Sequence, residues 1–341
     1  MLIAVTSSKN APGATTSALA LTLAWPRPVL LAELDPRGGD IVWGYGRGQN
    51  VGGAGLLRWQ LAVRVLPMAK TVWDEVVELP TEGHPRWWLP GLLEPKQAGA
   101  VDWSQVAQAL RSLDVDVIAD CGSVFGAPDR PHRAVWASAD LVALAVRPTL
   151  QGVHAARNAS GILRPDLMSD GLGPERLCSF LVGCRHGFPT KDVAAELEDV
   201  APVIGELTHD VDTADTLNGL RDQRKKFTRA PLPRDARTLA GELGALATEL
   251  SNRPATPAAT VAAPVASPRP PFSPPPELLG QRGSLADRAR VATPGPADVG
   301  VARASAPTPS ARRPIPVNRP VVPAVPPPPV PKPAQRKEQT A

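Results

Sequence analysis

Six short apolar runs, separated by segments with helical spacing, constrain the fold of this chain more than any other feature. They are rich in Val, Ile and Leu and lack the polar–apolar alternation of a half-exposed strand. Such runs are typical of strands buried on both faces of a parallel sheet. They cover Leu2–Thr6, Val29–Leu34, Val115–Asp120, Asp140–Val146, Leu177–Gly183 and Val203–Leu207, with a weaker run at Arg86–Leu89.

Helical spacing occurs between these runs, at Thr15–Ala24, Trp103–Leu113 and Thr190–Val200. Alternating strands and helices predict right-handed βαβ units and a doubly wound α/β domain with a mostly parallel sheet. We expect a last helix, Asp235–Leu250, to close the domain.

The composition changes near residue 252. Residues 253–341 hold 23 of the 41 prolines and carry 12 Lys/Arg against 4 Asp/Glu, a net charge of +8. Since the whole chain is +4, residues 1–252 carry −4. Proline lacks a backbone donor, and the segment has few large apolar groups to offset chain entropy. We therefore expect a folded domain over 1–252 and a disordered, basic, Pro-rich tail over 253–341, partly polyproline II.

Charge and cysteine usage exclude several classes of protein. The acidic balance of residues 1–252 argues against a broad nucleic-acid-binding face, so DNA binding is possible but not favoured. Three scattered cysteines do not make a disulfide framework or a zinc site, and a reducing cytoplasm fits them. The chain has no run of 18 or more apolar residues, so we expect no transmembrane segment.

Tryptophan is concentrated after the second strand. Five of the eight tryptophans lie between Trp43 and Trp88, in an insert of about residues 43–95. The simpler interpretation is that they fill the core beneath this insert. The alternative is a partner surface, because Trp is enriched at binding hot spots.

The segment between the first strand and the first helix is similar to a phosphate-binding loop. The strict pattern is G-x-x-x-x-G-K-[ST], and residues 8–15 read SKNAPGAT, which matches at Gly13 and Thr15 and departs at Ser8 and Ala14. A strand followed at once by a helix points backbone N–H groups at an anion. Gly13 allows close backbone approach, and Thr15 offers a hydroxyl to Mg²⁺.

Carboxylates follow two of the predicted strands. Glu33 and Asp35 lie at the end of one, and Asp120 at the end of another. The carboxyl ends of neighbouring parallel strands surround the ligand crevice of a doubly wound sheet. Carboxylates placed there can hold Mg²⁺ or orient a water molecule.

Together, the stretches SSKNAPGATTSALALTLA, LLAELDPRGGD and VIADCG resemble the MinD/ParA group of P-loop ATPases, and the resemblance runs from Met1 to about Leu250. That group has a deviant Walker A motif, K-G-G-x-G-K-[ST]. The resemblance implies a P-loop NTPase fold, ATP and Mg²⁺ as cofactors, a homodimer formed on nucleotide binding, and a place in the bacterial cytoplasm.

The resemblance also implies roles for single residues. Lys9 matches the signature lysine, which reaches across an ATP-sandwich dimer, and Asp35 matches an acid linked to the attacking water, so these two are the catalytic candidates. Thr15 matches the Mg²⁺ ligand, and Asp120 matches the Walker B acid that holds Mg²⁺ through water. Asp210 resembles an acid near the base. The nucleotide-binding candidates are Lys9, Asn10, Ala11, Pro12, Gly13, Ala14, Thr15, Thr16 and Asp210.

The chain departs from the family pattern at several of these positions. Ala14 replaces the lysine that contacts the β- and γ-phosphates, and Asn10 and Ala11 replace two glycines. Cys184 and Thr208 stand where the family often has Asn and Pro. Losing one electrostatic clamp commonly costs about 2–4 kcal/mol of transition-state stabilisation. We expect very slow or absent hydrolysis, while backbone donors, Mg²⁺ and Lys9 keep binding possible.

These features favour a nucleotide-dependent positioning or assembly factor, a role that degenerate family members have for pilus and secretion machines. An active ParA-type ATPase in chromosome or plasmid partitioning, in which Lys9 compensates for Ala14, is one alternative. A nucleotide-free adaptor is the other. A protein partner would bind the Trp-rich insert or the Pro-rich tail. The basic cluster at Arg221–Arg234 is interpreted as a solvated face in preference to a DNA-binding surface.

Overall fold

The computed structural model describes residues 1–8, 13–48, 53–62, 68–79, 83–126, 129–169, 173–222 and 227–252. The expected tail, 253–341, lies outside these residues, so the boundary at residue 252 stays a prediction.

The described chain forms an eight-stranded sheet flanked by helices on both faces, with the order β3-β4-β2-β5-β1-β6-β7-β8. Every neighbouring pair is parallel except β3 with β4. The strands are β1 Leu2–Ser7, β2 Val29–Glu33, β3 Val77–Glu78, β4 Arg86–Leu89, β5 Asp116–Ser123, β6 Leu141–Val146, β7 Leu177–Val182 and β8 Val203–Leu207. The predicted doubly wound, mostly parallel α/β fold is confirmed.

Nine α-helices are found in the described part of the chain. They are α1 Ala14–Ala24, α2 Leu56–Ala62, α3 Met68–Thr71, α4 Trp103–Arg111, α5 Arg133–Ser138, α6 Leu150–Ser169, α7 Thr190–Leu197, α8 Val211–Leu217 and α9 Pro231–Asn252. The last helix begins four residues before the predicted start. Pro231 and Pro233 lie in its first turn, where a missing N–H costs no intrahelical hydrogen bond.

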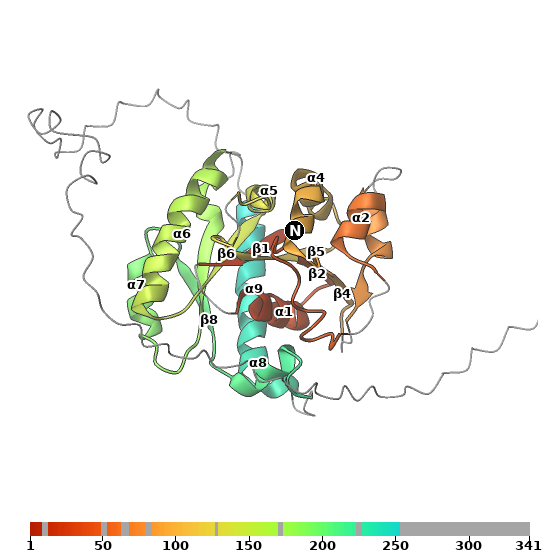
Figure 1. The fold of residues 1–341 in the computed structure, drawn as a ribbon. Helices are drawn as coiled ribbons and strands as arrows, with labels where there is room; N and C mark the ends of the chain where they lie inside the picture. The colour runs from red at the N-terminus through yellow and green to blue at the C-terminus, as the bar shows by residue number, and fades with distance from the viewer. Residues whose placement is uncertain are drawn as a thin grey trace, which may run out of the picture. The chain divides into compact units, whose positions relative to one another are not determined.

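Both faces of the sheet are buried, as the continuous apolar runs predict. In β1, Leu2 and Ala4 pack into one core with residues of α2, α4, α5, α6 and α7. Ile3 and Val5, which alternate with them, pack into the opposite core with α1, α8 and α9. Figure 1 shows α4 and α5 on one side of the central strands and α1 on the other. Because α1 is covered by both the sheet and α9, it is apolar nearly all round.

The Trp-rich insert adds strands to one edge of this sheet. Trp59 and Trp88 are fully buried there, which agrees with the core-filling interpretation. Trp43 is 69% exposed and Trp73 is 38% exposed, and Trp73 packs edge-on against Trp87 with ring centroids 5.0 Å apart. The partner-surface interpretation therefore concerns only the exposed tryptophans and stays a prediction.

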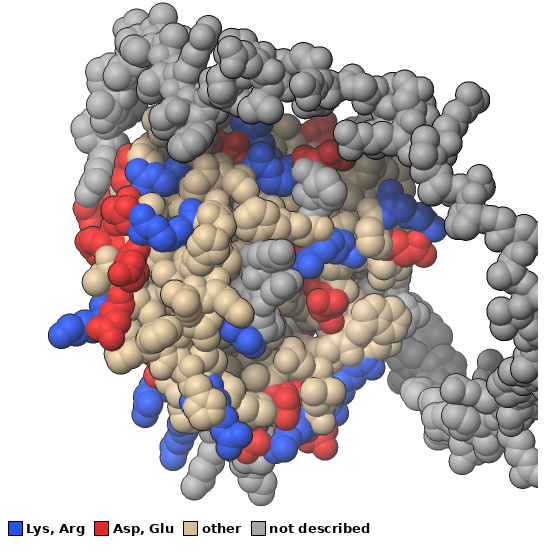
Figure 2. Space-filling model, turned by 60° about the vertical axis from the view of Figure 1, so that its left-hand side comes forward, with Lys and Arg blue, Asp and Glu red and all other residues tan. Residues whose placement is uncertain are grey.

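Some residues of the basic cluster form ion pairs with acids. Arg221 pairs with Asp212 and Asp215, and Arg47 pairs with Asp222. On the face that Figure 2 presents, Lys and Arg side chains are interspersed with Asp and Glu. These pairs favour the solvated-face interpretation over a DNA-binding surface.

Among the helices of the described residues, none combines the length and the apolar character needed to cross a bilayer.

Candidate functional site

The site lies where the strand order changes direction. β1 sits between β5 and β6, so the chain crosses to β2 on one side of β1 and later to β6 on the other. Ligands of doubly wound sheets bind outside the carboxyl ends of the strands at such a point. Val5 pairs with Asp120 and Ser7 with Ser123, with a register shift between them. The carboxyl ends of β1 and β5 therefore lie side by side at the same edge of the sheet.

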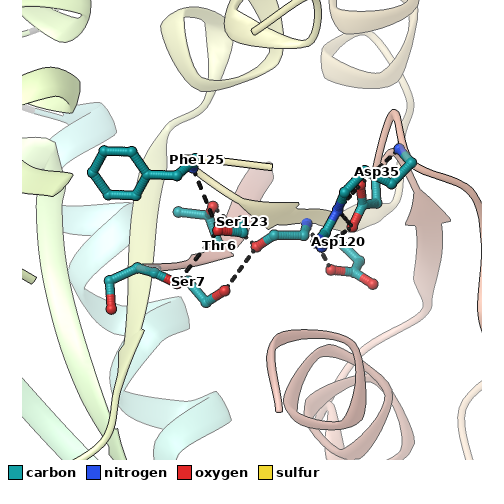
Figure 3. Close-up of polar contacts among 9 residues, drawn as sticks. Thr6, Ser7, Asp35, Asp120, Ser123 and Phe125 are labelled. Carbon is teal, nitrogen blue, oxygen red and sulfur yellow. Dashed lines mark hydrogen bonds and ion pairs between the residues drawn. The ribbon is translucent and has the colours of Figure 1, made fainter. Parts of the chain in front are cut away.

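Hydrogen bonds tie these two strand ends together. The hydroxyls of Thr6 and Ser7 each donate to the carbonyl oxygen of Gly122 at 3.2 Å. The Ser123 hydroxyl donates to the carbonyl of Ser8 at 3.3 Å and accepts from the N–H of Phe125. Figure 3 shows this network beside Asp35 and Asp120. The floor of the site is thus held by the strands and not by a free loop.

Helix α1 begins at the mouth of the site. Its N-cap is Gly13, with φ of 117°, and no side chain caps the helix. This backbone conformation favours glycine, and a Cβ at Gly13 would also lie 3.3 Å from Val182 Cγ1. The free N–H groups and the helix dipole make this end suitable for an anion. Ala14, the next residue, contributes a methyl group and no charge.

Thr15 and Asp120, the two predicted Mg²⁺ ligands, are brought together. The Thr15 side chain lies close enough to the Asp120 carboxyl group to act on its pKa, in the lowering direction, and the N–H of Gly122 donates to Asp120 Oδ1 at 3.1 Å. Asp120 is buried, and this burial, with the charges of Glu33 and Asp35, raises its pKa to about 7.

This pair fits a divalent cation. Hydroxyl and carboxylate oxygens are the ligands that Mg²⁺ prefers. A cation here would also offset the cost of ionising a carboxyl group that lies in the interior near two other acids. The sequence-based prediction for these two residues is therefore compatible with the geometry, although no metal contact is part of the structure.

Asp35 is held by a residue that the sequence reasoning missed. Its carboxylate accepts from the Arg37 backbone N–H at 2.9 Å, from Arg37 Nε at 3.1 Å and from Arg37 Nη2 at 2.6 Å. The carboxylate also lies against Gly122, where a Cβ would be 1.9 Å from Asp35 Oδ2. The Asp-Pro-Arg sequence after β2 is the local signal that could have revealed the pair. The predicted link of Asp35 to an attacking water stays a prediction.

Glu33 differs from the sequence-based expectation. Oε1 accepts from the N–H of Ile41 at 2.9 Å, and Oε2 accepts from Trp88 Nε1 at 2.8 Å and from the N–H of Gly91 at 3.1 Å. Burial raises the pKa of this carboxyl group. Both oxygens are engaged, so Glu33 joins the segments after β2 and β4 and is not available as a metal ligand.

A cavity of about 260 Å³ opens beside the start of α1. It is bounded on one side by the turn after β2 and on the other by the end of α8, where Asn218 accepts a hydrogen bond from the Thr16 hydroxyl at 3.1 Å. Of the predicted nucleotide-binding residues, four line it. The lining residues are Ser7, Gly13, Ala14, Thr15, Thr16, Leu19, Arg37, Asp40, Ile41, Gly44, Tyr45, Gly122, Leu217 and Asn218.

Other predicted site residues are not brought to this cavity. Asp210 caps α8, where it accepts from the N–H of Thr213 at 3.1 Å and from its hydroxyl at 2.6 Å. It is absent from the cavity lining, so a contact with the base stays a prediction. Lys9, Asn10, Ala11 and Pro12 lie outside the described residues, and no statement about their geometry follows.

Comparisons with known proteins agree on the fold. No family model matches the chain, and no curated protein matches its sequence. Three solved structures are similar over nearly their whole lengths. The septum site-determining protein MinD of Pyrococcus horikoshii OT3, complexed with Mg-ADP, is 16% identical with a TM-score of 0.55, and the alignment covers 74% of this chain and 99% of that one.

The other two have similar values. A ParA family ATPase from Chlorobium tepidum TLS is 17% identical with a TM-score of 0.53, over 71% of this chain and 98% of that one. The MinC:MinD cell division protein complex of Aquifex aeolicus is 17% identical with a TM-score of 0.51, over 71% and 96%. At these identities the similarity concerns the fold, which is that of the MinD and ParA P-loop ATPases.

Proposed function

We propose, from this MinD- and ParA-like fold and the geometry at the start of α1, that the chain is a nucleotide-binding positioning or assembly factor with weak or no ATP hydrolysis. The proximity of the buried Asp120 to Thr15, which lies in the first turn of α1 two residues after Gly13, carries the proposal. It unites a helix N-terminus suited to phosphate with two oxygen ligands suited to Mg²⁺.

Each residue has a distinct part in this site. The N–H groups at the start of α1 bind the phosphates, and Gly13 lets them approach the backbone. Thr15 and Asp120 would hold Mg²⁺, the latter through water, and the ion when bound neutralises phosphate charge. Lys9, if it acts as the family resemblance implies, contacts the phosphates of a second copy, so that nucleotide binding favours a homodimer.

Two features support weak hydrolysis. Ala14 has a methyl group at the position where a P-loop lysine would stabilise the charge of the transferring phosphoryl group. Asp35, the candidate for orienting water, has both carboxylate oxygens in contact with Arg37. Nucleotide binding depends less on either feature, because the helix N–H groups and Mg²⁺ stabilise the bound nucleotide as well as the transition state.

The positioning role rests on what the similar structures are named for. One is a septum site-determining protein and another is part of a cell division complex. In a factor of this kind, nucleotide binding controls where a larger assembly forms. Its cargo would be bound by the Trp-rich insert or the Pro-rich tail. We extend to this chain the localisation of pilus or secretion machines that degenerate family members perform.

Calorimetry with Mg·ATP tests the site. The full chain is expected to bind, and Thr15→Val is expected to weaken binding about tenfold or more, because the variant loses an oxygen ligand for Mg²⁺. Thr22→Val is the matched control: Thr22 is buried in the same helix, and its hydroxyl bonds only the Ala18 carbonyl.

No binding heat from the wild-type chain at millimolar Mg·ATP would contradict the proposal and favour the nucleotide-free adaptor. The same protein is expected to release phosphate at the background rate, with or without DNA. DNA-stimulated turnover would instead favour the partitioning ATPase.

A further inference from the structure

One cationic side chain lines the cavity beside α1 within the described residues, and it is Arg37. It belongs to the turn after β2, far in sequence from the phosphate-binding loop, yet it shares the cavity with Gly13, Ala14 and Thr15. The cavity therefore contains a positive charge even though the lysine position of the loop is occupied by Ala14.

Arg37 is oriented by a one-sided ion pair. Nε and Nη2 bond the carboxylate of Asp35, and no hydrogen bond from Nη1 to a described residue is found. A guanidinium has five N–H donors in a planar fork. Asp35 thus occupies one edge of the fork, and the edge that contains Nη1 remains for a second acceptor.

The surroundings keep this guanidinium in place and charged. Its Nε passes over Gly126, where a Cβ would lie only 2.9 Å away. The hydrogen bond with Asp35 raises the pKa of Arg37, and the charges of Asp35, Asp40 and Asp120 act in the same direction. About half of the side chain is exposed, so a ligand in the cavity can reach it.

A phosphate in this cavity needs such a group. Three acids, Asp35, Asp40 and Asp120, lie around the site, and each repels an anion. The positive end of α1 amounts to about half an elementary charge, which does not balance them. A guanidinium fork matches the geometry of phosphate oxygens and can bind two of them at once.

We propose that Arg37 is the phosphate-contacting cation of this site, in place of the lysine that Ala14 replaces, and that Asp35 is its positioning residue. This inference rests on the proposed function, since it assumes that the cavity holds the phosphates of a nucleotide. It also assigns to Asp35 a role other than contact with an attacking water.

The test measures the affinity of the full chain for Mg·ATP by calorimetry. Arg37→Gln is expected to weaken binding about 10- to 100-fold, the loss typical of one charge-assisted contact. Arg27→Gln is the matched control, because Arg27 is equally exposed and pairs through Nε with Asp116 at 2.7 Å. It does not line the cavity, so its replacement is expected to leave the affinity unchanged.

Two double variants separate phosphate contact from a structural role. In Ala14→Lys/Arg37→Gln the ammonium group reaches the same cavity, and we expect it to restore at least tenfold of the lost affinity. In Asp35→Asn/Arg37→Gln the unpaired carboxylate is gone, and we expect binding to stay weak. Thermal melts of each variant show which losses reflect unfolding.

The outcomes distinguish the two proposals. If Arg37→Gln binds as tightly as Arg27→Gln while Thr15→Val is weakened, the inference on Arg37 is overturned and the nucleotide site stands. Recovery of wild-type affinity in Asp35→Asn/Arg37→Gln also overturns it, because Arg37 would then act only by neutralising Asp35. If the wild-type chain binds no Mg·ATP, the proposed function fails and the inference fails with it.

Discussion

Gly122 makes more contacts within the site than its size suggests. Its N–H donates to Asp120, its carbonyl accepts from Thr6 and Ser7, and its Cα faces the carboxylate of Asp35. Its φ is 61°, in the left-handed region. The two acids of the site can approach one another only because this residue has no side chain.

Replacing Gly122 by Ala is expected to be strongly destabilising. The new Cβ would lie 1.9 Å from Asp35 Oδ2, so Asp35 and its partner Arg37 must move. Backbone strain and overpacking together should lower the free energy of unfolding by about 3 kcal/mol or more. Urea denaturation measures this loss, and calorimetry should find Mg·ATP binding abolished.

Gly53→Ala is the control for backbone strain alone. Gly53 has a φ of 76°, and nothing lies within 4 Å of a Cβ built on it, so we expect a loss of about 1 kcal/mol. If both variants lose the same stability, the close approach of Gly122 to Asp35 is not a constraint on the fold.

At the scale of elements, α4 and α5 are joined by three rings in edge-on contact. His132 precedes α5 and lies between Trp103 of α4 and Trp136 of α5, with ring centroids 6.1 Å and 4.5 Å away. Its side chain is fully buried. Burial lowers its pKa from 6.5 to about 4, so the ring packs as a neutral group.

The packing of α4 on α5 should therefore weaken in acid. Between pH 6.5 and 4 the unfolded chain binds a proton on His132 that the folded protein does not. Stability from this group is complete above about pH 6.5 and is lost as the pH falls, by about 3 kcal/mol at pH 4. The difference in unfolding free energy between pH 7 and pH 4 should be smaller by that amount in His132→Phe.

The comparison of slopes removes the packing cost of the substitution, which is the same at both pH values. If His132→Phe leaves the difference in unfolding free energy between pH 7 and pH 4 unchanged, His132 would have the same pKa in the folded and the unfolded protein.

At the scale of the whole molecule, α9 completes the second core. Its buried residues extend along the helix from Leu232 to Leu250 and pack with α1 and the sheet. Among the described residues, Leu250 is the last that contributes to this core. The predicted boundary between the domain and the Pro-rich tail falls at the same place.

A chain that ends at Asn252 is expected to fold like the full-length protein, with a melting temperature changed by no more than a few degrees. A chain that ends at Glu242 is the control. It lacks Leu243, Ala247 and Leu250, all of them buried, and should lose about 10 °C or more. A comparable loss in the longer truncation would place part of the folded domain beyond residue 252.

The sequence by itself determined that helices would cover both faces of a parallel sheet, and that a site would lie at the carboxyl ends of its strands. Strands buried on both faces show uninterrupted apolar runs, so β1, β5 and β6 could be recognised without their neighbours. Gly13, Thr15 and Asp120 follow from a local rule, that ligands gather where parallel strands end. The resemblance to the MinD and ParA proteins rested on the same short stretches.

Only the tertiary structure decided which partners Glu33 has and which cavity Arg37 lines. Glu33 is engaged by Trp88 and Gly91 because β4 lies beside β2, and no local pattern indicates that neighbour. Arg37 reaches the cavity because the turn after β2 lies over the end of β5. Side-chain partners across strands depend on contacts between segments distant in sequence. The burial of a strand, in contrast, can be predicted locally, because the strand consists of consecutive apolar residues. For this reason the fold could be predicted from the sequence, and the place of Arg37 in the cavity could not.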